Sequence, residues 1–253
     1  IGILVFTNNV SVGAYSMSLS YYILLPAIIY INDFFDNVNI KSTIIILVSL
    51  ILILVLGARG PFLCIGVFVL IRFINTKKKL DYKAILLNIL IVGVLITIFI
   101  FLKDILEHVY KFLLQFGIKS RTLHLFLEDS FYLSGREYIY SNILSEISKH
   151  PFIGIGLAGD RRVTGGAYAH NIVFEFLANY GVILGTVITI LNGIISLKSI
   201  FLKDKNWAIF MSMWFTISIV PLIVSGSYLT SIKFWIFLGL ALNVLKQVKQ
   251  VRK

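Results

Sequence analysis

Long apolar runs separated by short polar connections dominate this chain. Seven runs are long enough to suggest membrane-spanning helices, because a hydrocarbon core about 30 Å thick requires roughly 20 apolar residues, or somewhat fewer where flanking side chains snorkel. They lie near residues 12–31, 42–57, 60–74, 84–102, 171–197, 207–225 and 229–245. The runs are continuous, whereas barrel strands would alternate apolar and polar residues over short segments. The pattern predicts an all-α, polytopic transmembrane helical bundle.

One segment, residues 103–170, interrupts this pattern. We expect about four spans in residues 1–102, an extracytoplasmic loop in residues 103–170, and three spans followed by a basic cytoplasmic tail in residues 171–253. The chain opens on "IGILVF", which we expect to be the end of an earlier helix of a longer protein.

The long loop is predicted to contain helices, since unstructured loops of this length are uncommon. In "KDILEHVYKFLLQFG" the apolar residues have helical spacing and end at Gly117, which predicts an amphipathic helix on the bilayer surface. "REYIYSNILSEISKHP" is predicted to be a second helix, with Ser134 as its N-cap and Pro151 as its stop. The glycine-rich "FIGIGLAGDRRVTGGAYA" should then return irregularly to the membrane at His170.

The placement of the basic residues indicates topology. The chain is 58% hydrophobic and 14% charged, below the quarter usual in soluble domains, and carries a net charge of +11. Most of the surplus lies in "NTKKKLDYK", "SLKSIFLKDKN" and "KQVKQVRK", which the positive-inside rule assigns to the cytoplasm. Seven spans then alternate without conflict, with residues 103–170 outside. The charge is explained without a nucleic-acid partner, and none is predicted.

Four arginines on the outer side are candidates for binding an anion. Arg59 lies in the tight "GARGP" turn of a predicted helical hairpin, whose second helix Pro61 opens. A guanidinium fork matches two phosphate oxygens, although an arginine that snorkels to lipid headgroups would have the same sequence. Arg136, Arg161 and Arg162 lie in the long loop, where a solvated side chain is the simpler interpretation for each alone. Together, the four favour a pyrophosphate site at headgroup depth.

His170 is the candidate general base. It begins the fifth predicted span, with Asn171 beside it and Glu175 farther along. A lone interfacial histidine is more often a packing residue, but neutral imidazole is also the side chain best suited to accept a proton near pH 7. A buried carboxylate is unfavourable unless paired, so we expect an Arg or Asn partner for Glu175. The glycines of "GVILG" are expected to make a close helix contact.

Metal and nucleophilic-serine chemistry are disfavoured. The other three histidines show no metal-ligand spacing, and "LEDS" is more simply a solvated turn than a metal-binding acidic pair. No GxSxG motif is present, and the single cysteine, Cys64, is expected to be a packed thiol. No metal site and no cofactor are therefore predicted.

In this order, the motifs resemble those of the O-antigen ligase and polymerase superfamily, membrane glycosyltransferases of bacterial polysaccharide assembly. The similarity rests on "FTNNVSVGAYSMSLSYYILLPA", "GARGPFLCIGV", "SGREYIYSNILSEISKHPFIGIG" and "HNIVFEFLANYG". The chain departs from the family pattern in three places. Ala58 replaces a Ser, Tyr140 replaces a Trp, and "GVILGT" spaces its glycines one residue wider.

The resemblance implies a site and a reaction. An undecaprenyl-pyrophosphate-linked glycan would be the donor, its pyrophosphate held by Arg59, Arg136, Arg161 and Arg162. His170 would deprotonate an acceptor hydroxyl that attacks the anomeric carbon with inversion, with Asn171 and Glu175 in support. Arginines would replace a metal ion at the leaving pyrophosphate. The enzyme would lie in the lipid bilayer of the bacterial cytoplasmic (inner) membrane with its site on the extracytoplasmic face. Chain-length regulators and other polysaccharide assembly proteins are its candidate partners.

Several functions share these features. A polymerase would add one lipid-linked repeat unit to another, making O-antigen or capsule, and a ligase would move the finished glycan to a different acceptor. The composition and the loop favour the polymerase weakly. A lipid-linked sugar transporter would require charged or broken helices near the midplane, and the predicted spans are nearly free of charge. An assembly subunit without chemistry would tolerate loss of His170.

Overall fold

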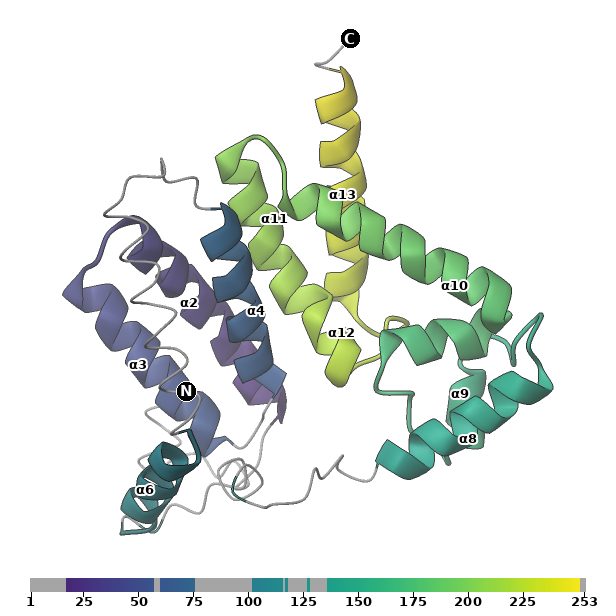
Figure 1. The fold of residues 1–253 in the computed structure, drawn as a ribbon, viewed down its shortest axis with the longest axis horizontal. Helices are drawn as coiled ribbons and strands as arrows, with labels where there is room; N and C mark the ends of the chain where they lie inside the picture. The colour runs from purple at the N-terminus through teal and green to yellow at the C-terminus, as the bar shows by residue number, and fades with distance from the viewer. Residues whose placement is uncertain are drawn as a thin grey trace. The chain divides into compact units, whose positions relative to one another are not determined.

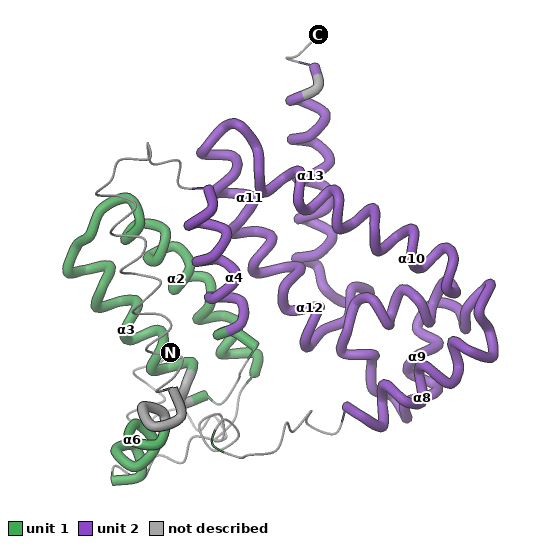
Figure 2. Tube along the Cα trace, in the orientation of Figure 1, with its two compact units in different colours: residues 1–62, 76–132 green, residues 63–75, 133–253 purple. Residues whose placement is uncertain are grey.

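The computed structural model describes residues 17–56, 60–75, 102–115, 117, 127 and 136–250. Its regular secondary structure in these ranges is helical, and no strand occurs there (Figure 1). The predicted all-α membrane class is thereby confirmed. The chain forms two compact units, one from residues 1–62 and 76–132 and the other from residues 63–75 and 133–253 (Figure 2).

In the first unit, two apolar helices form a hairpin. α2 (Met17–Asp36) packs against α3 (Ile40–Val55). Asn39 fixes the turn, because its Oδ1 accepts from the Ser42 backbone N–H at 2.7 Å and its Nδ2 donates to Asp33 at 2.9 Å. The loop helix α6 (Leu102–Gln115) ends just before Gly117, which has φ +74°, as the sequence predicted.

Three helices of the described chain are long and apolar enough to cross a membrane. They are Met17–Asp36, Ile172–Ile200 and Lys205–Val224, and two shorter apolar helices cover Ile40–Ile53 and Gly60–Asn75. The predicted run at 84–102 lies almost wholly outside the described residues. The predicted number of seven spans stays a prediction.

The second unit carries the remaining helices. They are α4 (Gly60–Asn75, of which residues 63–75 belong to this unit), α8 (Arg136–Lys149), α9 (Gly159–Val163), α10 (Ile172–Ile200), α11 (Lys205–Ser218), α12 (Val220–Val224) and α13 (Ile232–Gln250). α8 ends just before Pro151, as predicted, while its predicted N-cap Ser134 lies outside the described residues. Phe176 of α10, Met211 of α11 and Phe237 of α13 lie in one apolar core, which holds the first part of α10 against the last two long helices.

A sharp kink divides α10 at Gly181, which has φ 78° and ψ 173°. There the Ala178 carbonyl accepts from Ile155 N at 2.7 Å, and Val182 N donates to the Pro151 carbonyl at 2.6 Å. The α8–α9 connection thus takes over helix hydrogen bonds that the kink releases.

The glycines of "GVILG" do make close contacts, but with the loop and with the first part of α10 rather than with a separate helix. A Cβ on Gly181 would lie 2.4 Å from the Phe152 carbonyl oxygen, and one on Gly185 would lie 2.7 Å from the Phe176 carbonyl oxygen. In a straight helix, Gly185 and Phe176 would be about 13 Å apart along the axis. The glycines serve to fold α10 back on its own first part and on the loop.

Candidate functional site

His170 is held in an unusual backbone conformation directly before α10. Its φ is 55°, in the left-handed region that non-glycine residues seldom adopt. The Asp160 carboxylate fixes the preceding residue, because its Oδ2 accepts from Ala169 N at 3.0 Å. The imidazole is partly buried and lies against Tyr168, with ring centroids 4.1 Å apart. Its buried Nδ1 has no hydrogen-bond partner within the described part of the chain.

Asn171 is the N-cap of α10 and also ties that helix to α12. Its Oδ1 accepts from Val173 N at 2.9 Å and from Phe174 N at 3.2 Å. Its Nδ2 donates to the Ile223 carbonyl at 3.1 Å. The amide thus fixes the start of the helix directly after His170. The supporting role in catalysis that the sequence suggested for Asn171 stays a prediction.

Arg136, the first residue of α8, reaches the same place from another element. Its Nη1 donates to the Val224 carbonyl, next to the carbonyl that Asn171 binds. Burial, and then the Arg136 charge, lower the pKa of His170 below its ordinary value. The positive end of the α10 dipole acts in the same direction. This environment favours the neutral form of the His170 imidazole, which is the form that can accept a proton.

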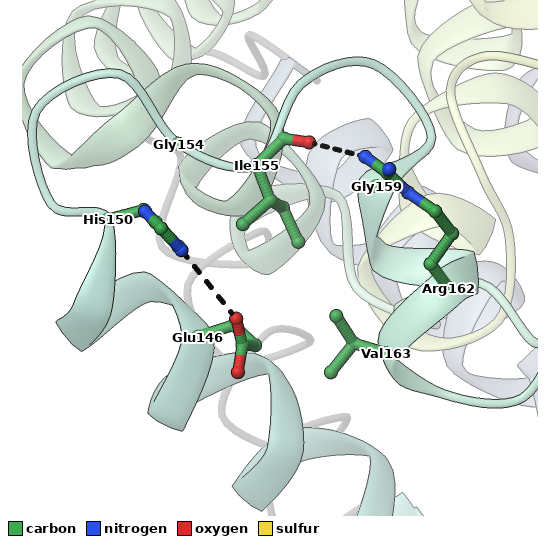
Figure 3. Close-up of a pocket in the computed structure, with 7 residues that line it drawn as sticks. All are labelled: Glu146, His150, Gly154, Ile155, Gly159, Arg162 and Val163. Atoms are coloured by element: carbon green, nitrogen blue, oxygen red, sulfur yellow. Dashed lines mark hydrogen bonds and ion pairs between the residues drawn. The ribbon is translucent and has the colours of Figure 1, made fainter.

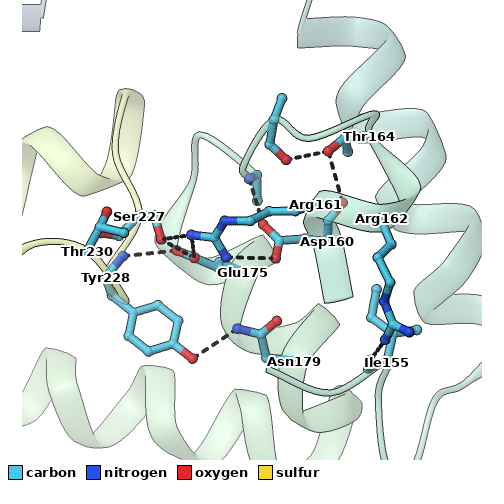
Figure 4. A network of polar contacts seen from close by, with 12 residues as sticks. Ile155, Asp160, Arg161, Arg162, Thr164, Glu175, Asn179, Ser227, Tyr228 and Thr230 are labelled. Atoms are coloured by element: carbon cyan, nitrogen blue, oxygen red, sulfur yellow. Dashed lines mark hydrogen bonds and ion pairs between the residues drawn. The ribbon is translucent and has the colours of Figure 1, made fainter. Parts of the chain in front are cut away.

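Glu175 lies one turn into α10 at the centre of a buried polar network (Figure 4). The carboxylate is fully buried and accepts from Ser227 Oγ and from Tyr228 N, the latter at 3.0 Å. Arg161 Nη2 lies 4.0 Å from Glu175 Oε1 and donates to Ser227 Oγ at 3.0 Å. The expected arginine partner of Glu175 is present.

Arg161 also contacts a second buried carboxylate. Its Nη1 is 3.6 Å from Asp160 Oδ1, and Asp160 is fully buried. One guanidinium therefore lies between two buried acids, and the network joins α9, α10 and the α12–α13 connection. Because Asp160 also holds Ala169, these contacts position the segment that carries His170.

The next residue, Arg162, points away from this network (Figure 4). Its Nη2 donates to the Ile155 carbonyl at 3.1 Å, and its side chain is exposed. The structure thus brings five of the predicted site residues to the start of α10, directly or through the buried network: Arg136, Arg161, His170, Asn171 and Glu175. It places Arg162 on another side of α9, and Arg59 lies outside the described residues.

Sequence reasoning missed several members of this network. Asp160, Ser227 and Tyr228 are buried partners of the predicted residues. The polar interruption "SGSY" between two apolar runs signals that its side chains need polar partners, but it does not say which. For Asp160 the only local signal is its position beside two arginines.

Comparison with known proteins identifies the family of this chain. The sequence profile of a family described as O-antigen ligase matches residues 44–190, more than half of the chain. The chain belongs to this family, and it is a membrane enzyme of O-antigen or polysaccharide assembly. No curated protein and no solved structure matches the chain. The matched range contains all the predicted site residues, from Arg59 to Glu175.

Proposed function

We propose that this protein transfers a glycan from undecaprenyl pyrophosphate to an acceptor hydroxyl, with His170 as the general base. The observation that carries the proposal is the environment of His170. The residue is fixed in a left-handed conformation at the start of α10, and burial and Arg136 lower the pKa of its imidazole. Family membership supports glycan transfer as the chemistry on which that base acts.

The reaction is a displacement at the anomeric carbon of the donor. His170 removes the proton of the acceptor hydroxyl, whose oxygen forms the new glycosidic bond as the bond from carbon to the pyrophosphate oxygen breaks. The electron pair leaves with undecaprenyl pyrophosphate, and attack from the opposite face inverts the anomeric centre. A positioned base typically contributes 10²–10⁴-fold to such a step.

The arginines divide into two groups in this proposal. Arg136, beside His170, binds the pyrophosphate and stabilises its growing charge, the part that a metal ion has in other transferases. The pyrophosphate-binding role of Arg59 stays a prediction from the sequence. Arg161 positions the site through Asp160 and Glu175, because its guanidinium is directed between those two acids. Asn171 and Glu175 hold the helix entry and the α12–α13 connection.

The identity of the acceptor distinguishes a polymerase from a ligase. We take it to be a second lipid-linked repeat unit, so that the product is a longer chain and the enzyme is a polymerase of the bacterial cytoplasmic membrane. With another acceptor, the same residues would act in a ligase. The site would lie on the extracytoplasmic face, where lipid-linked units are joined.

Replacing His170 by Ala and by Gln in the full-length parent tests this proposal. Surface glycan is separated by size on a gel, with equal membrane levels confirmed and His108→Ala, on the separate helix α6, as the matched control. We expect His170 variants to lose long chains while single repeat units remain. Long chains that persist on the lipid carrier, with loss of transfer, would identify a ligase. An unchanged pattern would remove His170 from the mechanism.

A further inference from the structure

A separate pocket lies between α8 and α9. It has a volume of about 550 Å³ and is lined by Glu146, His150, Gly154, Ile155, Gly159, Arg162 and Val163 (Figure 3). Neither His170 nor Arg136 is among these residues. Pockets of 300–1,000 Å³ are typical of small-molecule sites, so its size suits one or two sugar rings.

The α8 wall of the pocket carries an anion. Glu146 accepts from Lys149 Nζ at 2.6 Å, and His150 Nε2 lies 4.0 Å from its other carboxylate oxygen. The hydrogen bond from Lys149 lowers the pKa of Glu146. This wall therefore offers carboxylate oxygens as acceptors and an imidazole as a possible donor.

The α9 wall carries a cation that is not neutralised by an ion pair with any described residue. Arg162 donates one N–H to the Ile155 carbonyl, which orients a guanidinium with five donors beside the pocket. Its neighbour Arg161 differs, since its charge faces two buried carboxylates. Between the charged walls lie the apolar side chains of Ile155 and Val163.

This combination matches the chemistry of a saccharide. Sugar hydroxyls need both donors and acceptors, and the C–H faces of the ring need apolar contact. A carboxylate facing a guanidinium across apolar side chains supplies both. A simple cation would be repelled by Arg162, and a simple anion would leave the acceptor oxygens of Glu146 unused.

The pocket is joined to the candidate active site through α9. Asp160 on this helix holds Ala169, which precedes His170, and Arg162 two residues later lines the pocket. A ligand in the pocket would therefore lie across α9 from the network that positions His170. It would be close to the reacting group without occupying its place.

We propose that this pocket binds a sugar of the glycan chain beyond the sugar that reacts. The inference rests on the proposed function, because a glycan substrate supplies the ligand. By holding the chain at a second point, the pocket favours rebinding of long glycans and so increases product length.

Binding of a free glycan to the full-length protein tests the pocket directly. The probe is a mixture of short oligosaccharides made by partial acid hydrolysis of the host's own surface polysaccharide. Saturation-transfer NMR on protein in lipid nanodiscs measures its affinity. We expect Arg162→Ala and Glu146→Gln each to weaken binding at least fivefold. Glu137→Gln, on the same helix but outside the pocket, should stay within twofold of wild type, and so should His170→Ala.

The same variants are then compared in cells by glycan length. Arg162→Ala and Glu146→Gln should shorten the chains without abolishing them. Unchanged binding in both variants, or no binding by the wild type, would overturn the pocket proposal even if His170→Ala loses long chains. Conversely, lost binding in the pocket variants with unchanged chains in His170→Ala would retain the pocket and overturn the catalytic assignment.

Discussion

At the residue scale, the buried charges around Arg161 are unequal in number. Asp160 and Glu175 are both fully buried, and Arg161 is the cation within ion-pair distance of either among the described residues. With both acids ionised, the cluster carries one excess negative charge. The loss of the arginine and the loss of one acid should therefore have very different consequences.

We predict that Arg161→Gln is the most damaging change in this cluster. It leaves two buried carboxylates with no ion-pair partner in the described chain, and breaking a buried pair in this way costs about 3–5 kcal/mol. Asp160→Ala should cost about 1–3 kcal/mol, because it leaves the Ala169 N–H without its acceptor. Asp160→Asn keeps an acceptor oxygen and balances the charge, so it should cost less than alanine. Thermal unfolding of the purified full-length protein would measure this order, and equal loss in all three variants would contradict it.

A second prediction concerns the proton affinity of His170. Because burial and the Arg136 charge lower its pKa, His170 should be mostly neutral at the ordinary histidine pKa of about 6.5, and it should become protonated only as the pH falls through the lowered value. Activity that needs the neutral base should be lost over the same range. Arg136→Gln removes the cation, so the pKa of His170 should rise toward its ordinary value. The loss of activity on the acid side of the pH profile should then occur at higher pH.

Diethylpyrocarbonate modification measures this pKa without relying on activity. The rate is followed against pH in full-length protein whose other histidines are replaced by Gln. Lys198→Gln, an exposed cation near the other end of α10, serves as the control and should leave the midpoint unchanged. A midpoint that Arg136→Gln does not move would exclude the proposed electrostatic coupling.

At the element scale, the kink in α10 requires glycines, because other residues do not fit its backbone angles and close contacts. Gly181 has a φ and ψ in a region that is essentially restricted to glycine. Gly154 has φ +74°, and a Cβ there would lie 2.5 Å from the Ala178 carbonyl oxygen. We predict that Gly181→Ala and Gly154→Ala each destabilise the protein by about 1–3 kcal/mol through strain alone.

Gly193 is a matched control on the same helix. A Cβ there meets no atom within 4 Å, so Gly193→Ala should be neutral or stabilising, since alanine favours helix by about 1 kcal/mol over glycine. Melting temperatures of the purified proteins in one detergent compare the three variants. Equal melting temperatures in the three variants would contradict the strain predicted at Gly181 and Gly154.

The region around the kink also shows which features could be predicted from the sequence and which could not. The loop helices and their stops at Gly117 and Pro151 follow from local periodicity and local backbone preferences. The kink depends on bonds between Pro151 and Val182 and between Ile155 and Ala178, which no local pattern encodes. The need of Glu175 for a partner could be predicted from its burial, but Ser227 is 52 residues away, so that partner could not.

At the scale of the whole molecule, we predict that the kink divides α10 into a part that supports the site and a part that spans lipid. Residues 182–200 make a helix about 28 Å long, close to the thickness of a hydrocarbon core. Many of its apolar side chains are exposed, among them Ile183, Ile190 and Leu197. With such a boundary, His170 and the first part of α10 would lie outside the hydrocarbon core, at the depth of a lipid-linked pyrophosphate.

The same boundary predicts that the tip of the α8–α9 connection enters the bilayer interface. Phe152 and Ile153 are 74% and 84% exposed, and they follow Pro151, whose carbonyl binds the first residue after the kink. Their exposed apolar surface is thus adjacent to the exposed apolar surface of α10. We predict that an environment-sensitive NBD label on Phe152→Cys has blue-shifted emission in nanodiscs and is quenched by lipids that carry a spin label near the headgroup. The native Cys64 is buried and should not react.

Ser141→Cys, at an exposed position of α8, provides the comparison for this measurement. Its label should be quenched more strongly by a water-soluble quencher than the label at residue 152. If both labels were equally open to the water-soluble quencher, the kink would not mark the membrane boundary, and the depth inferred for His170 would be wrong. A shielded label at 152 would instead place the pocket beside Gly154 at the surface of the bilayer, where sugars next to a lipid pyrophosphate must lie.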